Sequence, residues 1–176
     1  GEIQYTLDEK DQTRTYNLQS EQGREHVRKN IGLCPQHDVL WNECTPYEHL
    51  RFFSLLKGIS THKVDEEVKN ILAKIRLPIG DEHRAVGSFS GGNKRKVSLA
   101  MALVGNPQVV FLDEPTAGMD PSSRRGVWDV LQSVKQGRSI VLCTHFMDEA
   151  DLLGDRIGIM AHGRMAAVGS SLFLKH

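Results

Sequence analysis

The hydrophobic positions of this chain change their spacing from one segment to the next, and each spacing predicts a different element. Ile3–Leu7 and Thr13–Leu18 alternate weakly on either side of a polar turn, which predicts an antiparallel hairpin. A charged helix is expected at Ser20–Lys29. The short apolar run Ile31–Cys34, which ends at Pro35, predicts a buried strand.

The middle of the chain has helical spacing. Thr45 and Glu48 are placed as in a capping box, and Pro46 occupies the first helical position. A second helix should stop before Pro78, and a third should follow Gly92. The positions expected to face the core are Tyr47, Leu50, Phe53, Leu56, Val64, Val68, Ile71, Leu72, Ile75, Val97, Ala100, Met101 and Val104.

The pattern then alternates between strands and helices. Val109–Leu112 and Ser139–Cys143 are continuous apolar runs, as expected of strands buried on both faces. Between them, Asp120 caps a helix that begins at Pro121 and ends at Gly137. A short helix and a closing hairpin follow at Met147–Leu153, Ile157–Met160 and Met165–Val168. The sum predicts an α/β fold with a mostly parallel sheet, an inserted helical subdomain and short antiparallel hairpins.

Composition excludes several classes of protein. At 176 residues and 39% hydrophobic, the chain suits one globular domain or most of one. Its 22 basic and 22 acidic residues balance, and no basic stripe stands out, so nucleic acid is not an expected partner. The longest mainly apolar stretch, Val97–Val104, is too short to span a bilayer. The three cysteines lack metal-ligand spacing and are expected to be reduced thiols.

Two carboxylates, Asp113 and Glu114, follow the apolar run Val109–Leu112. A buried strand that ends in acids presents them at the carboxyl edge of the sheet, where α/β proteins bind ligands. Phosphoryl transfer needs such a placement, since one acid can hold Mg²⁺ and the other can orient the attacking water. Taken alone, the pair could equally be two solvated acids at a strand end.

Three further features could bind phosphate or its metal. Ser90, Gly91 and Gly92 precede a helix and would expose backbone N–H groups to an anion. Gln36 follows a strand and could sense a metal-bound water, and the neutral imidazole of His145 could contact a γ-phosphate. Each feature alone is also typical of an ordinary helix cap, a solvated glutamine or a surface histidine.

Together, these motifs resemble the nucleotide-binding domain of an ABC (ATP-binding cassette) transporter, a P-loop NTPase. Five motifs occur in that family's order: the Q-loop at Gln36, the signature at Phe89–Asn93, Walker B at Val109–Asp113 with the catalytic glutamate at Glu114, the D-loop at Ala117–Asp120 and the switch histidine at His145. Phe89 and Asn93 replace the more usual leucine and glutamine. Cys34–His37, Asp113–Arg125, Met147–Arg156 and Gly169–Lys175 further resemble the A subfamily, which consists of large eukaryotic membrane proteins mostly associated with lipid movement.

The resemblance implies a role for each motif. The complete protein would bind ATP and Mg²⁺, and two nucleotide-binding domains would close head to tail over two ATP molecules. Glu114, His145 and Gln36 would be catalytic, and Asp113 with Gln36 would hold Mg²⁺, partly through water. The residues that would contact the opposite domain's ATP in trans are Ser90, Gly91, Gly92 and Asp120.

The resemblance also implies partners and a division of the chain. Residues 1–176 would be a partial nucleotide-binding domain on the cytoplasmic face of a membrane, joined to transmembrane domains. Residues 1–44 would be core with the hairpin and Q-loop, and 45–105 the helical subdomain with the signature. Residues 106–176 would be core with Walker B, the D-loop and the switch histidine.

One motif of the family does not occur. No stretch fits Gly-x-x-x-x-Gly-Lys-Ser/Thr, the Walker A loop that cradles phosphates. The chain is therefore expected to be a fragment that is inactive alone, with apolar residues uncovered on the strand that leads to His145. The alternative is a catalytically inactive half-site subunit that completes a partner's ATP site in trans.

Overall fold

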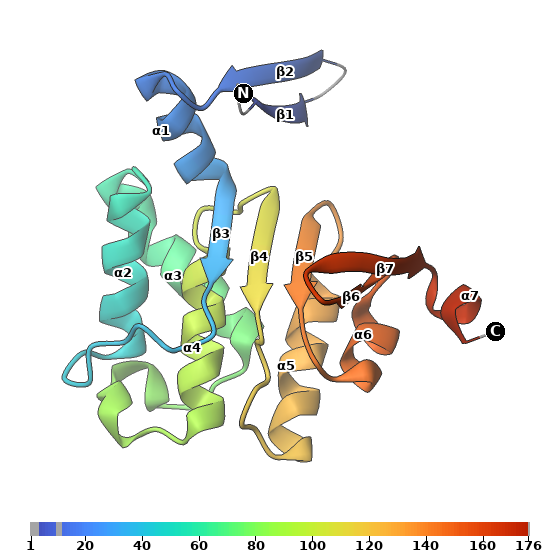
Figure 1. The fold of residues 1–176 in the computed structure, drawn as a ribbon. Helices are drawn as coiled ribbons and strands as arrows, with labels where there is room; N and C mark the ends of the chain where they lie inside the picture. The colour runs from blue at the N-terminus through green and yellow to red at the C-terminus, as the bar shows by residue number, and fades with distance from the viewer. Residues whose placement is uncertain (1–3, 10–11, 176) are drawn as a thin grey trace.

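The computed structural model describes residues 4–9 and 12–175. At its amino end, β1 (Gln4–Glu9) pairs antiparallel with β2 (Gln12–Asn17), which confirms the predicted hairpin (Figure 1). Ile3, where that prediction began, lies outside the described residues. Both strands extend further into the expected polar turn than their weak alternation indicated.

The other elements confirm the α/β fold. In chain order they are α1 (Glu21–Asn30), β3 (Ile31–Cys34), α2 (Pro46–Leu56), α3 (Thr61–Ile75), the 3₁₀ turns η1 (Asp81–His83) and η2 (Val86–Ser88), α4 (Gly91–Leu103), β4 (Val109–Asp113), α5 (Pro121–Val134), β5 (Ser139–Cys143), α6 (Met147–Leu153), β6 (Ile157–Ala161), β7 (Arg164–Gly169) and α7 (Ser171–Leu174). β3, β4 and β5 form a parallel sheet in that order, and β6 pairs antiparallel with β7. In the described part of the chain, no helix is long and apolar enough to cross a bilayer.

Local chemistry sets the helix starts. At α2, the backbone N–H of Glu48 donates to Thr45 Oγ1 at 3.1 Å and the Thr45 N–H donates to Glu48 Oε2 at 2.8 Å, so the capping box is confirmed. At α5, the Asp120 carboxylate accepts from two backbone N–H groups. This helix ends at Val134, before the predicted Gly137, which adopts a positive φ of 74° in the following turn.

The core lies between the sheet and the helices packed against it (Figure 1). Most of the predicted core positions are buried there, including Leu50, Ile71 and Ile75. Leu56 is 69% exposed, so its assignment to the core was wrong. A spacing of three residues turns only about 300° around a helix, so a face drawn at every third residue drifts, and Leu56 points to the side opposite Tyr47.

One face of the parallel sheet is covered and the other is open. Figure 1 shows α4 and α5 behind the sheet. On the other face, Leu33, Phe111 and Val141 lie side by side in the strand register and are 62%, 39% and 46% exposed. The prediction that β4 and β5 are buried on both faces was therefore wrong for the described residues. The exposed Val141 agrees with the expectation that the strand leading to His145 presents apolar side chains.

Close packing on the covered face positions α4. A Cβ at Gly32 in β3 would collide with the backbone carbonyl of Ala102, so only glycine allows α4 to approach β3 this closely. The helix runs antiparallel to the strands, which places its amino end beyond their carboxyl ends (Figure 1). The division at residues 44/45 and 105/106 stays a prediction.

Candidate functional site

Parallel pairing gathers four of the predicted site residues at one edge of the sheet. Asp113 is the last residue of β4, and Glu114 follows it. Gln36 lies two residues beyond the end of β3, and His145 lies two residues beyond the end of β5. Because β4 lies between β3 and β5, all four residues belong to the carboxyl edge, where α/β sheets place their ligands.

Glu114 and His145 are in direct contact. Glu114 Oε2 lies 2.7 Å from His145 Nδ1, with the carboxylate side chain 18% exposed and the imidazole 62% exposed. The backbone of Glu114 adopts a left-handed φ of 48°, which is uncommon for a residue other than glycine. Its N–H donates to the Cys143 carbonyl at 2.9 Å, so a main-chain hydrogen bond to β5 supports the unusual conformation.

The contact involves one ring nitrogen of His145. An imidazole has two ring nitrogens, and Nδ1 is the one that lies against Glu114. Nε2 is therefore the nitrogen that a phosphate oxygen could meet. The neutral imidazole expected from the sequence stays a prediction.

Asp113 and Gln36 have the donor chemistry that Mg²⁺ prefers. Both side chains are exposed at the edge, and in the described chain neither engages in a hydrogen bond or an ion pair. Mg²⁺ is typically bound by one or two carboxylate or amide oxygens, by water and by substrate phosphates. The residues present fit that ion.

The signature residues form the amino end of α4. The Ser90 side chain caps the helix by accepting from the Asn93 N–H at 3.3 Å, and it is exposed. Apart from its chain neighbours and the helix's own backbone, no described atom lies within 4 Å of the position that a Cβ of Gly91 would occupy. The Ser90 hydroxyl proton and the N–H groups of Gly91 and Gly92 are thus open to an external acceptor.

The amino ends of α4 and α5 meet. A Cβ on Gly92 would come within 3.2 Å of Ser123 Cβ, so glycine permits the close approach. Asp120, which caps α5, is exposed beside it. The residues predicted to act in trans therefore form one surface, beyond the sheet edge that carries Gln36, Asp113 and Glu114.

Two polar residues that sequence reasoning missed hold these segments together. Arg95, only 4% exposed, donates hydrogen bonds to the loops that follow β3 and β4. Its position on α4 could have indicated that it is buried. Ser98, Leu99 and Ala102 lie three, four and seven residues further on, on the same helix face, and all three are buried. A charge on the buried face of a helix needs partners.

The second residue is Glu149, which is fully buried in α6. Its Oε1 accepts from Thr116 Oγ1 and from Trp128 Nε1, each at 2.9 Å. Arg124 of α5 also stacks over the Phe146 ring, with its guanidinium carbon 4.1 Å from the ring centroid. The segment after His145 is thereby fixed to the loop that leads to residues 117–120.

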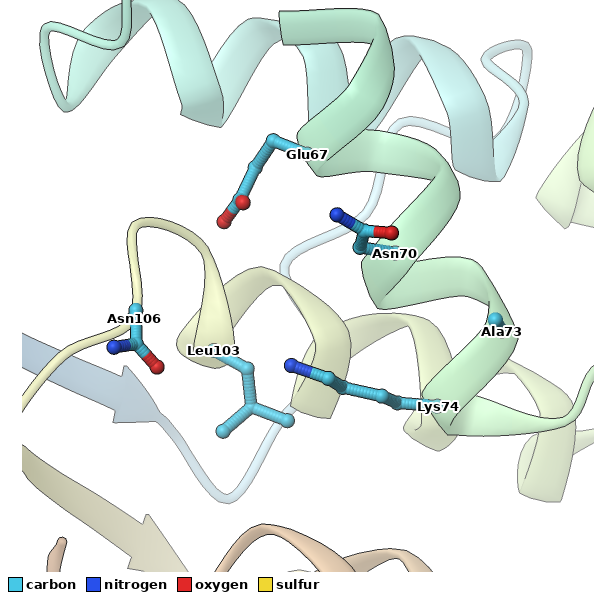
Figure 2. A pocket seen from close by; sticks show the side chains of 6 residues that line it. All are labelled: Glu67, Asn70, Ala73, Lys74, Leu103 and Asn106. Carbon is cyan, nitrogen blue, oxygen red and sulfur yellow. The ribbon is translucent and has the colours of Figure 1, made fainter. Parts of the chain in front are cut away.

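A hollow of about 280 Å³ lies elsewhere, between α3 and the end of α4 (Figure 2). Its lining residues are Glu67, Asn70, Ala73, Lys74, Leu103 and Asn106. Glu67 Oε1 accepts the Gly105 N–H at 2.9 Å at the rim of this hollow. The hollow lies toward the amino end of β4, away from the candidate site.

Comparison with known proteins identifies the family. A family model described as ABC transporter matches residues 1–117, a stretch that includes the Q-loop, the signature and Walker B. The chain belongs to the ABC transporter family. It is 49% identical over 159 residues to the ABC transporter A family member 2 of Arabidopsis thaliana and 55% identical over 150 residues to the human phospholipid-transporting ATPase ABCA3. These likenesses make it an A-subfamily cassette.

The aligned regions cover 90% and 85% of this chain, but the chain spans only 16% and 9% of the lengths of those two relatives. A solved structure of the ATP-binding cassette MJ0796, a dimer in a post-hydrolysis state bound to ADP and Pi, matches the fold with a TM-score of 0.76. That match has 21% identity and covers 94% of this chain and 76% of the other.

Proposed function

We propose that this chain is part of the ATP-hydrolysing cassette of an A-subfamily transporter that moves lipids across a membrane, and that it is inactive without a Walker A loop. The observation that carries the proposal is the 2.7 Å contact between Glu114 and His145, on the same edge as Asp113 and Gln36. Carboxylate, imidazole and oxygen donors at the carboxyl edge of a parallel sheet are the groups that phosphoryl transfer requires. The name of the human relative, a phospholipid-transporting ATPase, supports the substrate class.

In this proposal, each edge residue has one task. Asp113 and Gln36 hold Mg²⁺, which when bound neutralises charge on the phosphates. Glu114 orients the attacking water, and its left-handed backbone fixes the direction of the carboxylate. His145 lies against Glu114 through Nδ1 and contacts a γ-phosphate oxygen through Nε2.

The trans surface serves the second domain. Ser90, Gly91 and Gly92 offer a hydroxyl and helix-end N–H groups to the opposite domain's ATP, and Asp120 lies beside them. Two cassettes then close head to tail at the cytoplasmic face of a membrane and act on transmembrane domains. The dimeric, nucleotide-bound state of the solved cassette with the same fold is consistent with this arrangement.

A second candidate function is a half-site subunit. It is favoured by the exposure of Ser90 and Gly91 on a surface separate from the sheet edge. Such a subunit would complete a partner's ATP site and hydrolyse nothing itself. Mixing the chain with a Walker A-bearing domain whose own signature serine is disabled tests this function. Restored ATP hydrolysis supports the half-site role, and its absence removes it.

The main proposal is tested with Glu114→Gln in the full-length protein that contains this chain. We expect ATP turnover to fall about a hundredfold or more, because the water loses its orienting carboxylate, while ATP stays bound. Glu66→Gln, at an exposed position of α3, is the matched control. Turnover and movement of a labelled phospholipid are measured together. Unchanged turnover in Glu114→Gln would contradict the proposal.

A further inference from the structure

Arg95 is a buried cation whose whole donor capacity is used. Its guanidinium has five N–H groups, and six oxygens lie within hydrogen-bonding distance. The contacts are Nε to Pro115 O at 2.9 Å, Nη1 to Pro35 O at 2.6 Å, Gln36 O at 3.3 Å and Asp38 Oδ1 at 3.2 Å, and Nη2 to Asp113 O at 2.7 Å and Glu114 O at 3.1 Å.

These acceptors come from two segments that are far apart in the sequence. One follows β3 and contains Gln36, and the other ends β4 and contains Asp113 and Glu114. The side chain that joins them stands on a third element, α4, about one turn after Gly91 and Gly92. Arg95 therefore connects the sheet edge directly to the signature helix.

The charge of the guanidinium is balanced within the same cluster. Asp38 provides the carboxylate, and its Oδ1 also accepts from Ser98 Oγ at 2.7 Å, one turn along α4 from Arg95. A paired and fully hydrogen-bonded charge can remain buried, whereas removal of one partner strands the others. The loop after β3 is thus fixed to α4 at two points.

Arg95 also supports the strained residue of the site. Glu114 has a φ of 48°, and its carbonyl accepts from Arg95 Nη2 and from the Ala117 N–H at 3.1 Å. The Glu114 N–H is held by Cys143. Backbone strain persists only where the surroundings over-determine it, and Arg95 supplies part of that support.

We propose that Arg95 is a positioning residue for ATP hydrolysis. It contacts no reacting group, and it sets Gln36, Asp113 and Glu114 relative to one another and to the signature end of α4. The proposal rests on the ATPase function proposed above. Lysine should not be able to take over this role. Its single ammonium nitrogen cannot reach the carbonyls of both loops, whereas the three nitrogens of the planar guanidinium do.

The test compares Arg95→Lys with Arg138→Lys in the full-length protein. Arg138 is a matched control, because it too donates to several main-chain carbonyls, those of Pro107 at 3.2 Å and Val134 at 2.6 Å, and to Asn106. It does so near the amino end of the sheet. Both substitutions keep the charge and lose the fork, so they differ mainly in location.

The first measurement is hydrogen exchange of backbone amides without nucleotide. Arg95→Lys should speed exchange in peptides that cover residues 35–38 and 113–117, and Arg138→Lys should not. The second is steady-state kinetics at a temperature where both variants are folded. Arg95→Lys should lower kcat roughly ten- to a hundredfold while changing the KM for ATP by less than about threefold, because the fault lies in transition-state geometry.

The outcomes separate the two proposals. If the wild type hydrolyses ATP and Glu114→Gln does not, but Arg95→Lys matches Arg138→Lys in kcat and exchange, the role of Arg95 is refuted and the proposed function stands. If Arg95→Lys raises KM and leaves kcat intact, the positioning role is also refuted. A wild-type protein without ATPase activity would overturn the proposed function itself.

Discussion

At the amino end of the sheet, two charged side chains bind main-chain groups. Arg138 donates to the carbonyls of Pro107 and Val134, and Glu67 accepts from the backbone of Gly105. At the carboxyl end, the side chains of Gln36 and Asp113 extend into solvent, and the carboxylate of Glu114 lies on a strained backbone against an exposed imidazole. Both ends of the sheet carry charged and amide side chains, but these side chains bind the main chain at the amino end and face solvent at the carboxyl end.

The difference shows how a site can be recognised in this fold. The hollow of Figure 2 lies near the amino end of β4, away from the candidate site, so its volume alone does not indicate chemistry. The carboxyl end has exposed donors and acceptors together with a left-handed glutamate, a combination typical of ligand sites. The left-handed residue at the amino end is Asn106, a residue type that tolerates this backbone more readily. At the carboxyl end, substitutions of the exposed side chains should therefore affect activity, whereas substitutions of the buried or capping side chains that hold its loops should affect stability.

The largest difference is expected from His145→Ala. Loss of the imidazole removes the partner of Glu114 and should lower ATP turnover about a hundredfold or more. Because the side chain is 62% exposed, the melting temperature should hardly change. Phosphate release assays and thermal melting of the full-length protein measure both effects, with His62→Ala on α3 as the control. Equal turnover in the two variants would break the comparison.

Ser90→Arg should have the next largest effect. A long charged side chain at the amino end of α4 would obstruct closure on the second domain, and turnover should fall roughly ten- to a hundredfold. Ser133→Arg adds the same side chain near the carboxyl end of α5 and should leave turnover intact. Hydrolysis rates of both variants, measured under saturating ATP, check this. Normal turnover in Ser90→Arg would remove the proposed trans role.

Glu149→Ala should reduce stability at the carboxyl end. The hydroxyl of Thr116 and the indole N–H of Trp128 would lose their acceptor in a buried site, at a cost of about 3 kcal/mol. Glu149→Gln keeps an acceptor oxygen and should stay within about 1 kcal/mol of the wild type. Thermal melting of the nucleotide-free protein separates the two. Because glutamine conserves the volume of glutamate, similar losses in both variants would contradict the claim that the retained acceptor oxygen carries the stability.

The smallest effect concerns the cap of α5. Hydrogen bonding to the Ser123 side chain, and then to backbone N–H groups, holds the pKa of Asp120 below its usual value of 3.8. A lowered folded pKa means that the carboxylate stabilises the fold above the unfolded pKa and loses this effect as pH falls through the folded value. Asp120→Asn caps without titrating, so its melting temperature should depend less on pH below about pH 4 than that of the wild type. An unchanged acid profile in Asp120→Asn would argue against the cap as its source.

The sequence predicted the elements well because hydrophobic period and caps are local properties. Thr45, Glu48 and Asp120 specify their helix starts through atoms within three residues, and the structure has them as expected. The carboxyl-edge cluster was predictable because parallel strands end together. The hydrophobic pattern could not predict that Phe111 is exposed. Its exposure depends on which face of the sheet the helices cover, and that is a property of the tertiary structure.

The two buried charges were missed for a related reason. Arg95 lies between Lys94 and Lys96, and such a run normally indicates a solvated helix face. Five of its six acceptors are main-chain carbonyls, which have no sequence signature. Glu149 follows Asp148 in a short acidic helix, and only tertiary packing brings Thr116 to it. Long-range hydrogen bonds of this kind must be seen in coordinates.

The left-handed backbone at position 114 makes the residue that is best for stability different from the residue that is best for ATP turnover. Glycine there would relieve about 1–2 kcal/mol of conformational energy, since it adopts this geometry without a steric penalty. It would also delete the carboxylate that faces His145. Variants selected only for thermal resistance should therefore accumulate glycine at this position, and those selected for work done per ATP should keep glutamate.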